Sequence, residues 1–308
     1  MDEQSGEQQA ACWMAAMRRG AFEAAWTIND AVRQARAGVP CGHWPRHLQY
    51  VWDGTPLTGK RVLVRCSHGL GDTLQFIRYI PLIKAIAQEV MVGAQPALLP
   101  LLRTMYGIDR LLPLHDGPPE VEYEVDVESM ELPYLFRTTL ATIPADIPYL
   151  HVEPAAFPRP RHLAVGLVWA AGEWDHARRS IPFPLLAPLA LVPQVALYIL
   201  QRGPALDHRH PSFGTLSGSD DILEAARIMR ALDLVISVDT MPAHLAGALG
   251  VPVWTLLDAA ADWRWMEGRV ESPWYPTMRL FRQEKRGVWA PVIARVIAAL
   301  TRCTAVNP

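Results

Sequence analysis

Short apolar runs alternate with helix-forming segments along most of this chain, and that alternation limits the fold more than any other feature. The first run, residues 62–66, is followed by a glycine-containing turn and a helical pattern that extends to about residue 86. Such alternation is typical of parallel sheets whose two faces are covered by helices. The predicted strands are residues 62–66, 89–93, 110–113, 123–127, 163–169, 195–200, 234–238 and 251–256.

A proline-rich segment divides these strands into two series. Residues 151–162 contain three prolines and no apolar periodicity, which favours an interdomain linker. We therefore predict an α/β fold of two Rossmann-like, parallel-sheet domains, residues 59–155 and residues 156–308. Loops at the carboxyl ends of the strands are expected to face a cleft between the two domains, which is the usual place for a ligand.

Ahead of the first domain, residues 7–37 predict a short helical hairpin. Apolar residues recur at helical spacing on both sides of Arg19-Gly20, which forms the turn. The hairpin resembles one tetratricopeptide-type repeat, but a solenoid needs about three repeats to be stable. We expect residues 1–58, the hairpin and its connector, to pack on the next domain as a cap.

The composition argues against several classes of protein. Hydrophobic residues make up 50% of the chain and the formal net charge is −2, which does not fit a nucleic-acid-binding protein. The longest apolar stretch, residues 185–200, is interrupted by Pro188 and Pro193, so no membrane span is expected, while peripheral association stays open. There is no signal-peptide pattern and no CxxC pair, so we expect a cytoplasmic protein with reduced cysteines.

The first candidate site is the segment His68-Gly69-Leu70-Gly71-Asp72, directly after the first predicted strand. Glycines permit a tight turn and the close approach of a ligand, so His68, Gly69 and Gly71 are candidates for substrate or nucleotide binding. The spacing fits neither the dinucleotide fingerprint nor the P-loop. In the simplest alternative, Asp72 is only the N-cap of the following helix.

The second candidate site is Asp239-Thr240 together with His244, where a buried strand ends and a helix begins near Pro242. The free N–H groups and the positive dipole end of a helix N-terminus suit a diphosphate. His244 falls in the first turn of that helix and is expected to face the same region. Capping by Asp239 or Thr240, with a partly buried histidine, is the structural alternative.

Residues that follow two further strands complete the candidates for nucleotide binding. Arg178 and Arg179 come after the strand that ends at Trp169, and guanidinium groups bind phosphate oxygens bidentately. We include Trp169 itself and Gln201, which directly follows the strand of residues 195–200. A solvated basic turn is the alternative for the arginine pair.

Two other patterns are less informative. The segments Asp262-Trp263-Arg264-Trp265 and Ser272-Pro273-Trp274-Tyr275 are rich in aromatic residues, which stack on bases or sugars but are equally common in cores. Glu124, Asp126 and Glu128 alternate as in one half-exposed strand, with no further ligand cluster nearby. We therefore predict no metal site and no cofactor.

Together these motifs resemble the bacterial heptosyltransferase-like group, glycosyltransferase family 9, and especially its members that carry tetratricopeptide segments. The similarity spans most of residues 47–300 in the family's order. It implies a GT-B fold, with a nucleotide-sugar donor held mainly by the C-terminal domain and the acceptor on the N-terminal side, and usually no metal. The segments that carry it are HGLGDTLQFIRYIPLI, LVWAAG with RRSIP, DLVISVDTMPAHLAGALGVPVW, and DWRW followed by SPWYPTMRLFRQ.

The resemblance also implies roles for the candidate residues. Asp72 matches the general base that removes the proton of the acceptor hydroxyl. The D-T-x-x-x-H element beside the donor diphosphate corresponds to Asp239, Thr240 and His244. An arginine of the 178–179 pair would balance charge on the leaving nucleotide diphosphate. The expected outcome is inversion at the anomeric carbon.

Donor and acceptor stay open at this point. Met241-Pro242 replaces small residues that are common in relatives, and an arginine stands where better-studied heptosyltransferases have lysine, so ADP-heptose is one nucleotide sugar among several. The acceptor is lipopolysaccharide core, another glycan or a protein. A protein of another class also fits, namely a catalytically silent GT-B module that binds a sugar nucleotide or a protein. Retention of Asp72, Asp239 and His244 favours the active transferase.

Overall fold

The computed structural model describes residues 3–42, 44–49, 51–115, 117, 119–156, 162–173, 175–207 and 213–306. The contacts divide the chain into two compact units. Unit 1 comprises Met1–Ala145 and Asp262–Gly268, and unit 2 comprises Asp146–Ala261 and Arg269–Pro308. Part of the predicted linker, residues 157–161, lies outside the described residues.

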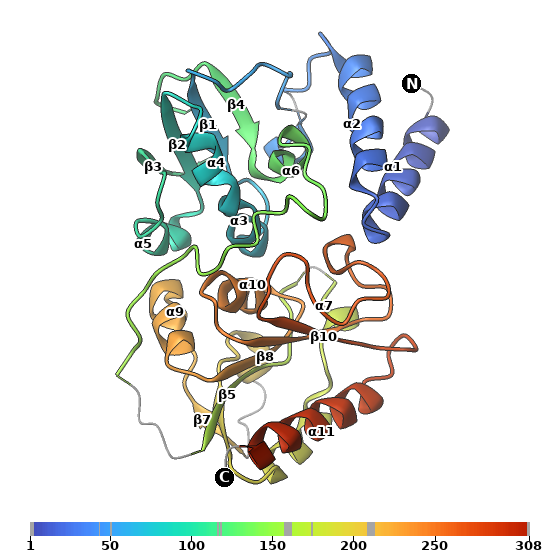
Figure 1. Ribbon diagram of the computed structural model, residues 1–308, viewed down its shortest axis with the longest axis vertical. Helices are drawn as coiled ribbons and strands as arrows, with labels where there is room; N and C mark the ends of the chain where they lie inside the picture. Colours follow the sequence, from blue (N-terminus) through green and yellow to red (C-terminus); the bar gives the residue numbers. More distant parts are fainter. Residues whose placement is uncertain are drawn as a thin grey trace. The chain divides into compact units, whose positions relative to one another are not determined.

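Unit 1 begins with the helical hairpin predicted from the sequence. Helices α1 (Glu3–Arg18) and α2 (Phe22–Arg36) lie side by side in Figure 1. Gly20 has a φ of 71°, a left-handed conformation that glycine adopts without steric cost, and it makes the turn between them. Phe22 and Trp26 are buried and fix the hairpin against the rest of the unit.

The described part of unit 1 also holds a four-stranded parallel sheet with the order β3-β2-β1-β4. Its central strand, β1, is buried along its middle residues, as expected for a parallel sheet covered on both faces. The elements are η1 (Arg46–Leu48), β1 (Arg61–Arg65), α3 (Leu70–Phe76), η2 (Ile77–Tyr79), α4 (Ile80–Lys84), β2 (Glu89–Ala94), η3 (Pro96–Leu98), α5 (Leu99–Leu102), β3 (Arg110–Pro113), β4 (Val125–Glu128), η4 (Ser129–Glu131), α6 (Leu132–Leu135) and, from later in the chain, η6 (Trp263–Trp265).

The described part of unit 2 holds a six-stranded parallel sheet with the order β10-β9-β8-β5-β6-β7. Its apolar core joins strands β5, β8 and β9 to helix α11, which lies beside the sheet in Figure 1. The elements are β5 (Leu163–Val168), α7 (His176–Arg179), η5 (Phe183–Leu191), β6 (Val195–Ile199), α8 (Pro204–Asp207), β7 (Thr215–Leu216), α9 (Ile222–Arg230), β8 (Leu234–Val238), α10 (Met241–Ala248), β9 (Val253–Leu257), β10 (Met278–Arg282) and α11 (Ala290–Val306).

The structure confirms the predicted α/β class with two parallel sheets, but some elements differ from the sequence prediction. The helix expected up to about residue 86 is broken into α3, η2 and α4, because Pro81 has no N–H to continue the hydrogen-bond ladder. The sequence also predicts a helix over residues 184–191, but this segment forms a 3₁₀ run, η5, that contains Pro188. Edge strands β7 and β10 were not predicted.

No helix among the described residues is long and apolar enough to cross a bilayer.

Candidate functional site

Two contacts within unit 1 hold the carboxylate of Asp72, which lies in the first turn of α3. Gly69 is the N-cap residue of α3 and Asp72 is the third residue of the helix, so Asp72 does not take the N-cap position considered from the sequence. Its Oδ2 accepts a hydrogen bond from the Gly69 N–H at 3.0 Å. Its Oδ1 accepts a hydrogen bond from Arg264 Nη2 at 2.6 Å. A Cβ at Gly69 would lie 3.2 Å from Asp72 Oδ2, so glycine leaves room for this contact, and Gly71 follows in the first helical turn.

Arg264 is a partner of Asp72 that the sequence analysis missed. The two residues are 192 positions apart, and Arg264 lies in a segment that was noted only for its aromatic residues. The arginine between two tryptophans was the signal available in the sequence. Its side chain is 10% exposed, so the ion pair with Asp72 is largely shielded from water.

His68 lies in the loop between β1 and α3, and its imidazole is partly buried. Burial lowers the pKa of His68, the neighbouring Asp72 opposes that shift, and His47 and Arg264 add to it. The imidazole is therefore neutral at pH 7 and able both to donate and to accept a hydrogen bond. The main chain of the loop is fixed by Gln95, whose Nε2 donates to the His68 carbonyl at 2.7 Å.

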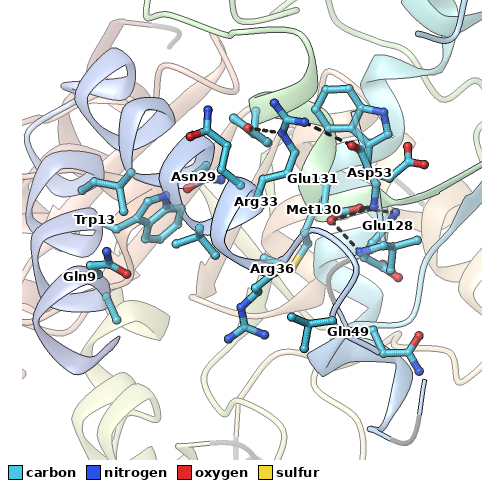
Figure 2. Close-up of a pocket in the computed structure, with 18 of the residues that line it drawn as sticks. Gln9, Trp13, Asn29, Arg33, Arg36, Gln49, Asp53, Glu128, Met130 and Glu131 are labelled. Carbon is cyan, nitrogen blue, oxygen red and sulfur yellow. Dashed lines mark hydrogen bonds between the residues drawn. The ribbon is translucent and has the colours of Figure 1, made fainter. Parts of the chain in front are cut away.

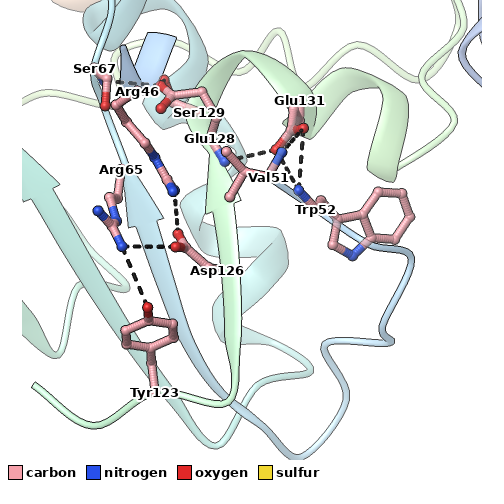
Figure 3. A network of polar contacts seen from close by, with 10 residues as sticks. All are labelled: Arg46, Val51, Trp52, Arg65, Ser67, Tyr123, Asp126, Glu128, Ser129 and Glu131. Atoms are coloured by element: carbon pink, nitrogen blue, oxygen red, sulfur yellow. Dashed lines mark hydrogen bonds and ion pairs between the residues drawn. The ribbon is translucent and has the colours of Figure 1, made fainter. Parts of the chain in front are cut away.

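Next to this loop, a network of polar contacts joins the ends of β1 and β4 (Figure 3). Glu128 ends β4 and is 3% exposed, so it does not lie on a half-exposed face as the alternation had predicted. Its Oε1 accepts hydrogen bonds from the Ser67 N–H at 3.0 Å and from Ser129 Oγ at 3.2 Å. Burial raises the pKa of the Glu128 carboxyl to about 7, against the Ser67 hydrogen bonds and the charge of Arg46, which lower it.

The other carboxylates of the network are engaged by the protein itself. Asp126 forms ion pairs with Arg46 at 2.5 Å and with Arg65 at 2.8 Å. Glu131 accepts hydrogen bonds from the N–H groups of Glu128, Val51 and Trp52, while its burial raises its pKa. Within the described ranges, no group of three or more histidine, cysteine or acidic side chains is arranged to hold a metal ion.

Beside this network, a cavity of about 980 Å³ opens in unit 1 between the hairpin and the end of β4 (Figure 2). Trp13 of α1 and Arg33 of α2 line one side, and Met130 and Glu128 line the other. His68 also lines it, so the cavity reaches the loop between β1 and α3, directly before the helical turn that carries Asp72. Its volume is at the upper end of what small-molecule sites show, and it combines aromatic, amide and charged side chains.

In unit 2 the second candidate segment lies at a strand-to-helix junction, as its sequence predicts. Strand β8 is buried throughout and ends at Val238, and α10 begins at Met241 with Thr240 as its N-cap residue. The Thr240 side chain makes no capping hydrogen bond. The structure brings Arg179 to this junction, where its Nη1 donates to the Asp239 carbonyl at 2.7 Å. A cation and a helix N-terminus thus meet at one point of unit 2.

His244 lies one turn into α10 and is 5% exposed. Its Nδ1 is 3.0 Å from the Tyr275 hydroxyl, and the two rings pack edge to face. Tyr275 is fully buried, and its ring packs against Gly247, which lies on α10 like His244. The helix therefore holds His244 through Tyr275, a residue that the sequence analysis placed only in an aromatic cluster.

Replacement of Gly247 by alanine is expected to destabilise the protein. An added Cβ would lie 2.4 Å from Tyr275 Cδ1, so the ring or the helix must move. Overpacking of this kind costs about 1–3 kcal/mol, partly offset by the better helix propensity of alanine. Thermal unfolding measures the loss. Gly6→Ala in α1 is the matched control, because a Cβ there meets nothing within 4 Å, and a lower melting temperature in that variant alone would contradict the packing argument.

The remaining predicted residues serve the framework of unit 2 in this structure. Arg178 forms an ion pair with Asp175 and donates to the Ala260 carbonyl at 2.9 Å. Gln201 Oε1 accepts hydrogen bonds from the N–H groups of Trp169 and Ala170 at 3.0 and 2.9 Å, which ties β5 to the end of β6. The Trp169 ring is 2% exposed and packs in the core. Arg179 is thus the member of the arginine pair that reaches Asp239.

Comparisons with known proteins agree with this architecture. Residues 204–285 match the model of glycosyltransferase family 9 (heptosyltransferase), and this range contains Asp239, Thr240 and His244. The structure of the Escherichia coli ADP-heptose lipopolysaccharide heptosyltransferase II is similar, with a TM-score of 0.56 and 14% identity over 80% of this chain and 99% of that one. The iron-containing dodecameric glycosyltransferase TibC of enterotoxigenic E. coli superposes with a TM-score of 0.57 and 11% identity, over 81% and 78% of the chains. The predicted GT-B-type fold is therefore confirmed, and the resemblance to family 9 is confirmed for residues 204–285.

Among curated proteins, Protein FlbA of Caulobacter vibrioides is 28% identical over 290 residues. The alignment covers 81% of this chain but 48% of FlbA, so the chain spans about half the length of that relative.

Proposed function

From a GT-B-type fold with a glycosyltransferase family 9 region, we propose that the chain transfers a sugar from a nucleotide diphosphate donor to an acceptor hydroxyl. The observation that carries this proposal is the junction of β8 and α10. There Arg179 bonds the Asp239 carbonyl, beside a helix N-terminus and inside the matched region. The positive dipole end of a helix and a guanidinium are groups that recognise a diphosphate.

The donor diphosphate is assigned to unit 2. Asp239 and Thr240 lie where the helix begins, and Arg179 supplies positive charge at the same place. Negative charge grows on the leaving nucleotide as the glycosidic bond breaks, and preorganised dipoles and cations stabilise it. Of the candidate donors, ADP-heptose and other nucleotide sugars all offer this diphosphate.

The attacking hydroxyl is activated by Asp72 in this proposal. Its carboxylate is fixed by Gly69 and Arg264, so it is oriented before an acceptor binds. The carboxylate takes the hydroxyl proton while the oxygen attacks the anomeric carbon from the face opposite the leaving nucleotide, which inverts that carbon. No metal takes part in this scheme.

The acceptor is assigned to the cavity of unit 1, because His68 connects that cavity to the start of α3, where Asp72 lies. The neutral His68 imidazole can hydrogen-bond a hydroxyl, and Trp13 and other aromatic side chains can pack on a sugar face. A glycan, including lipopolysaccharide core, and a sugar-accepting protein side chain both present such a hydroxyl.

Calorimetry with ADP, GDP, UDP and dTDP tests the donor site. We expect one of these nucleotides to bind, and His244→Ala to weaken its binding about 3- to 10-fold, the worth of one hydrogen bond. Tyr275→Phe removes the hydroxyl that contacts His244 and is expected to have a smaller effect in the same direction. Affinity unchanged in His244→Ala, with the fold intact, would remove His244 from the site.

A further inference from the structure

A short segment from late in the chain, Asp262–Gly268, is part of unit 1. Its Trp263 packs edge to face on Trp13 of α1, with ring centroids 5.6 Å apart, and stacks on Phe76 of α3 at 6.3 Å. The Glu267 N–H donates to the Arg18 carbonyl at the end of α1, at 2.8 Å. The hairpin and α3 therefore hold this segment from two sides.

Within the segment, Arg264 is fixed by aromatic rings and by two carboxylates. Its guanidinium carbon lies 4.8 Å from the Trp263 ring centroid and 5.4 Å from that of Phe76. Its Nη1 is 2.8 Å from Asp262 Oδ1, and its Nη2 is 2.6 Å from Asp72 Oδ1. A guanidinium that is planar, stacked and paired at both terminal nitrogens, Nη1 and Nη2, has little freedom to move.

We propose that Arg264 is a positioning residue for Asp72, and that the segment Asp262–Gly268 aims the Asp72 carboxylate at the acceptor hydroxyl. This inference rests on the proposed function, because it assumes that Asp72 is the base. The Gly69 N–H occupies Oδ2 and Arg264 occupies Oδ1, so the plane of the carboxylate is set by both. Misplacement of a reacting group by about 1 Å costs on the order of 100-fold in rate, which gives such positioning a measurable value.

The same contacts give the hairpin a role in catalysis. Trp13 of α1 packs against Trp263, and Trp263 packs against the Arg264 guanidinium, which binds Asp72. A shift of α1 would therefore change the position of the Asp72 carboxylate through these contacts. Trp13 also lines the cavity assigned to the acceptor. An acceptor in that cavity would therefore contact Trp13, the first of the side chains that hold Asp72 in place.

Kinetics of four variants test the inference: Arg264→Gln, Arg264→Lys, Asp72→Asn and the double variant Asp72→Asn/Arg264→Gln. The assay is nucleoside diphosphate release from the donor that the wild-type protein uses. We expect Arg264→Gln to lower kcat about 10- to 100-fold with the donor KM unchanged, and Arg264→Lys to recover part of that loss, because lysine keeps the charge but not the planar fork. The double variant should be no slower than Asp72→Asn, because both changes remove one function.

The outcomes separate this inference from the proposed function. A normal kcat in Arg264→Gln, or losses that multiply in the double variant, would overturn the positioning role while leaving Asp72 as the base. Near-normal turnover in Asp72→Asn would overturn the base assignment itself. Thermal unfolding of each variant shows whether a lower kcat reflects loss of the fold.

An NMR titration of His68 provides a readout that needs no donor. Because Arg264 lowers and Asp72 raises the pKa of His68, Arg264→Gln is expected to raise that pKa and Asp72→Asn to lower it. A His68 pKa that stays the same in both variants would mean that the ion pair does not exist beside this imidazole in solution, which overturns the inference.

Discussion

Asp72→Asn is expected to lower turnover about 10²- to 10⁴-fold, the usual contribution of a general base, while nucleotide affinity stays nearly constant. The asparagine side-chain oxygen can still accept the hydrogen bond from the Gly69 N–H, so the start of α3 keeps its contact. What the variant loses is a group that can take a proton, together with the ion pair to Arg264. Steady-state release of nucleoside diphosphate measures the effect.

Asp109→Asn is a matched control for this variant. Asp109 is another ion-paired aspartate of unit 1, bound to Lys84 Nζ at 2.6 Å and outside the loop of Asp72. We expect a change in thermal stability but none in turnover. Near-normal turnover in Asp72→Asn would leave Asp72 with a structural role, and another residue would have to act as the base.

The second large effect concerns stability and comes from Glu128. The pKa of its carboxyl is about 7 in the folded chain, against the ordinary 4.5 in the unfolded one. Between these values the folded state binds more protons, so the free energy of unfolding falls as the pH rises from about 4.5 to 7. The raised pKa contributes about 3 kcal/mol to the free energy of unfolding. This stabilisation is present in full below pH 4.5 and is lost above pH 7.

Glu128→Gln is expected to remove most of this pH dependence. The glutamine side-chain oxygen can accept the hydrogen bonds from Ser67 and Ser129, and its neutral amide does not titrate. Urea unfolding at a series of pH values between 4.5 and 8 measures the slope. Glu122→Gln is the control, because Glu122 is 88% exposed and its loss should leave the slope as it is. If the pH dependence persists in Glu128→Gln, other groups must cause it, and the buried Glu131 is the first candidate.

Much of the fold could be predicted from the sequence because buried parallel strands appear as short apolar runs between helices. The apolar runs at β5 and β8 are easily recognised in the sequence. Strand β7, in contrast, has two residues and both are exposed. β10 is an edge strand in which two of the five residues are arginines, so its apolar pattern is weaker. The two helices that differ from the prediction each contain a proline, Pro81 or Pro188, which interrupts the helix but leaves the neighbouring strands in place.

The candidate site was less predictable, because its contacts depend on distant parts of the chain. The loop of Asp72 and the β8–α10 junction are local motifs and are visible in the sequence. The ion pair of Asp72 with Arg264 requires a segment 192 residues away to lie in unit 1, which no local pattern encodes. Glu128 has the spacing of a solvent-facing strand residue, yet it is buried because the chain turns into η4 directly after it.

The proposed activity of this chain is the transfer of a sugar from a nucleotide diphosphate donor. The most direct measurement incubates the purified protein with isotope-labelled ADP-, GDP-, UDP- and dTDP-linked sugars and follows the release of labelled sugar from each. We predict that one donor releases its sugar with an equal amount of nucleoside diphosphate, and that Arg179→Gln slows this release because the charge beside Asp239 is lost. Binding of a nucleotide without release from any of the four donors, with or without glycan acceptors, would contradict the claim and favour a silent binding module.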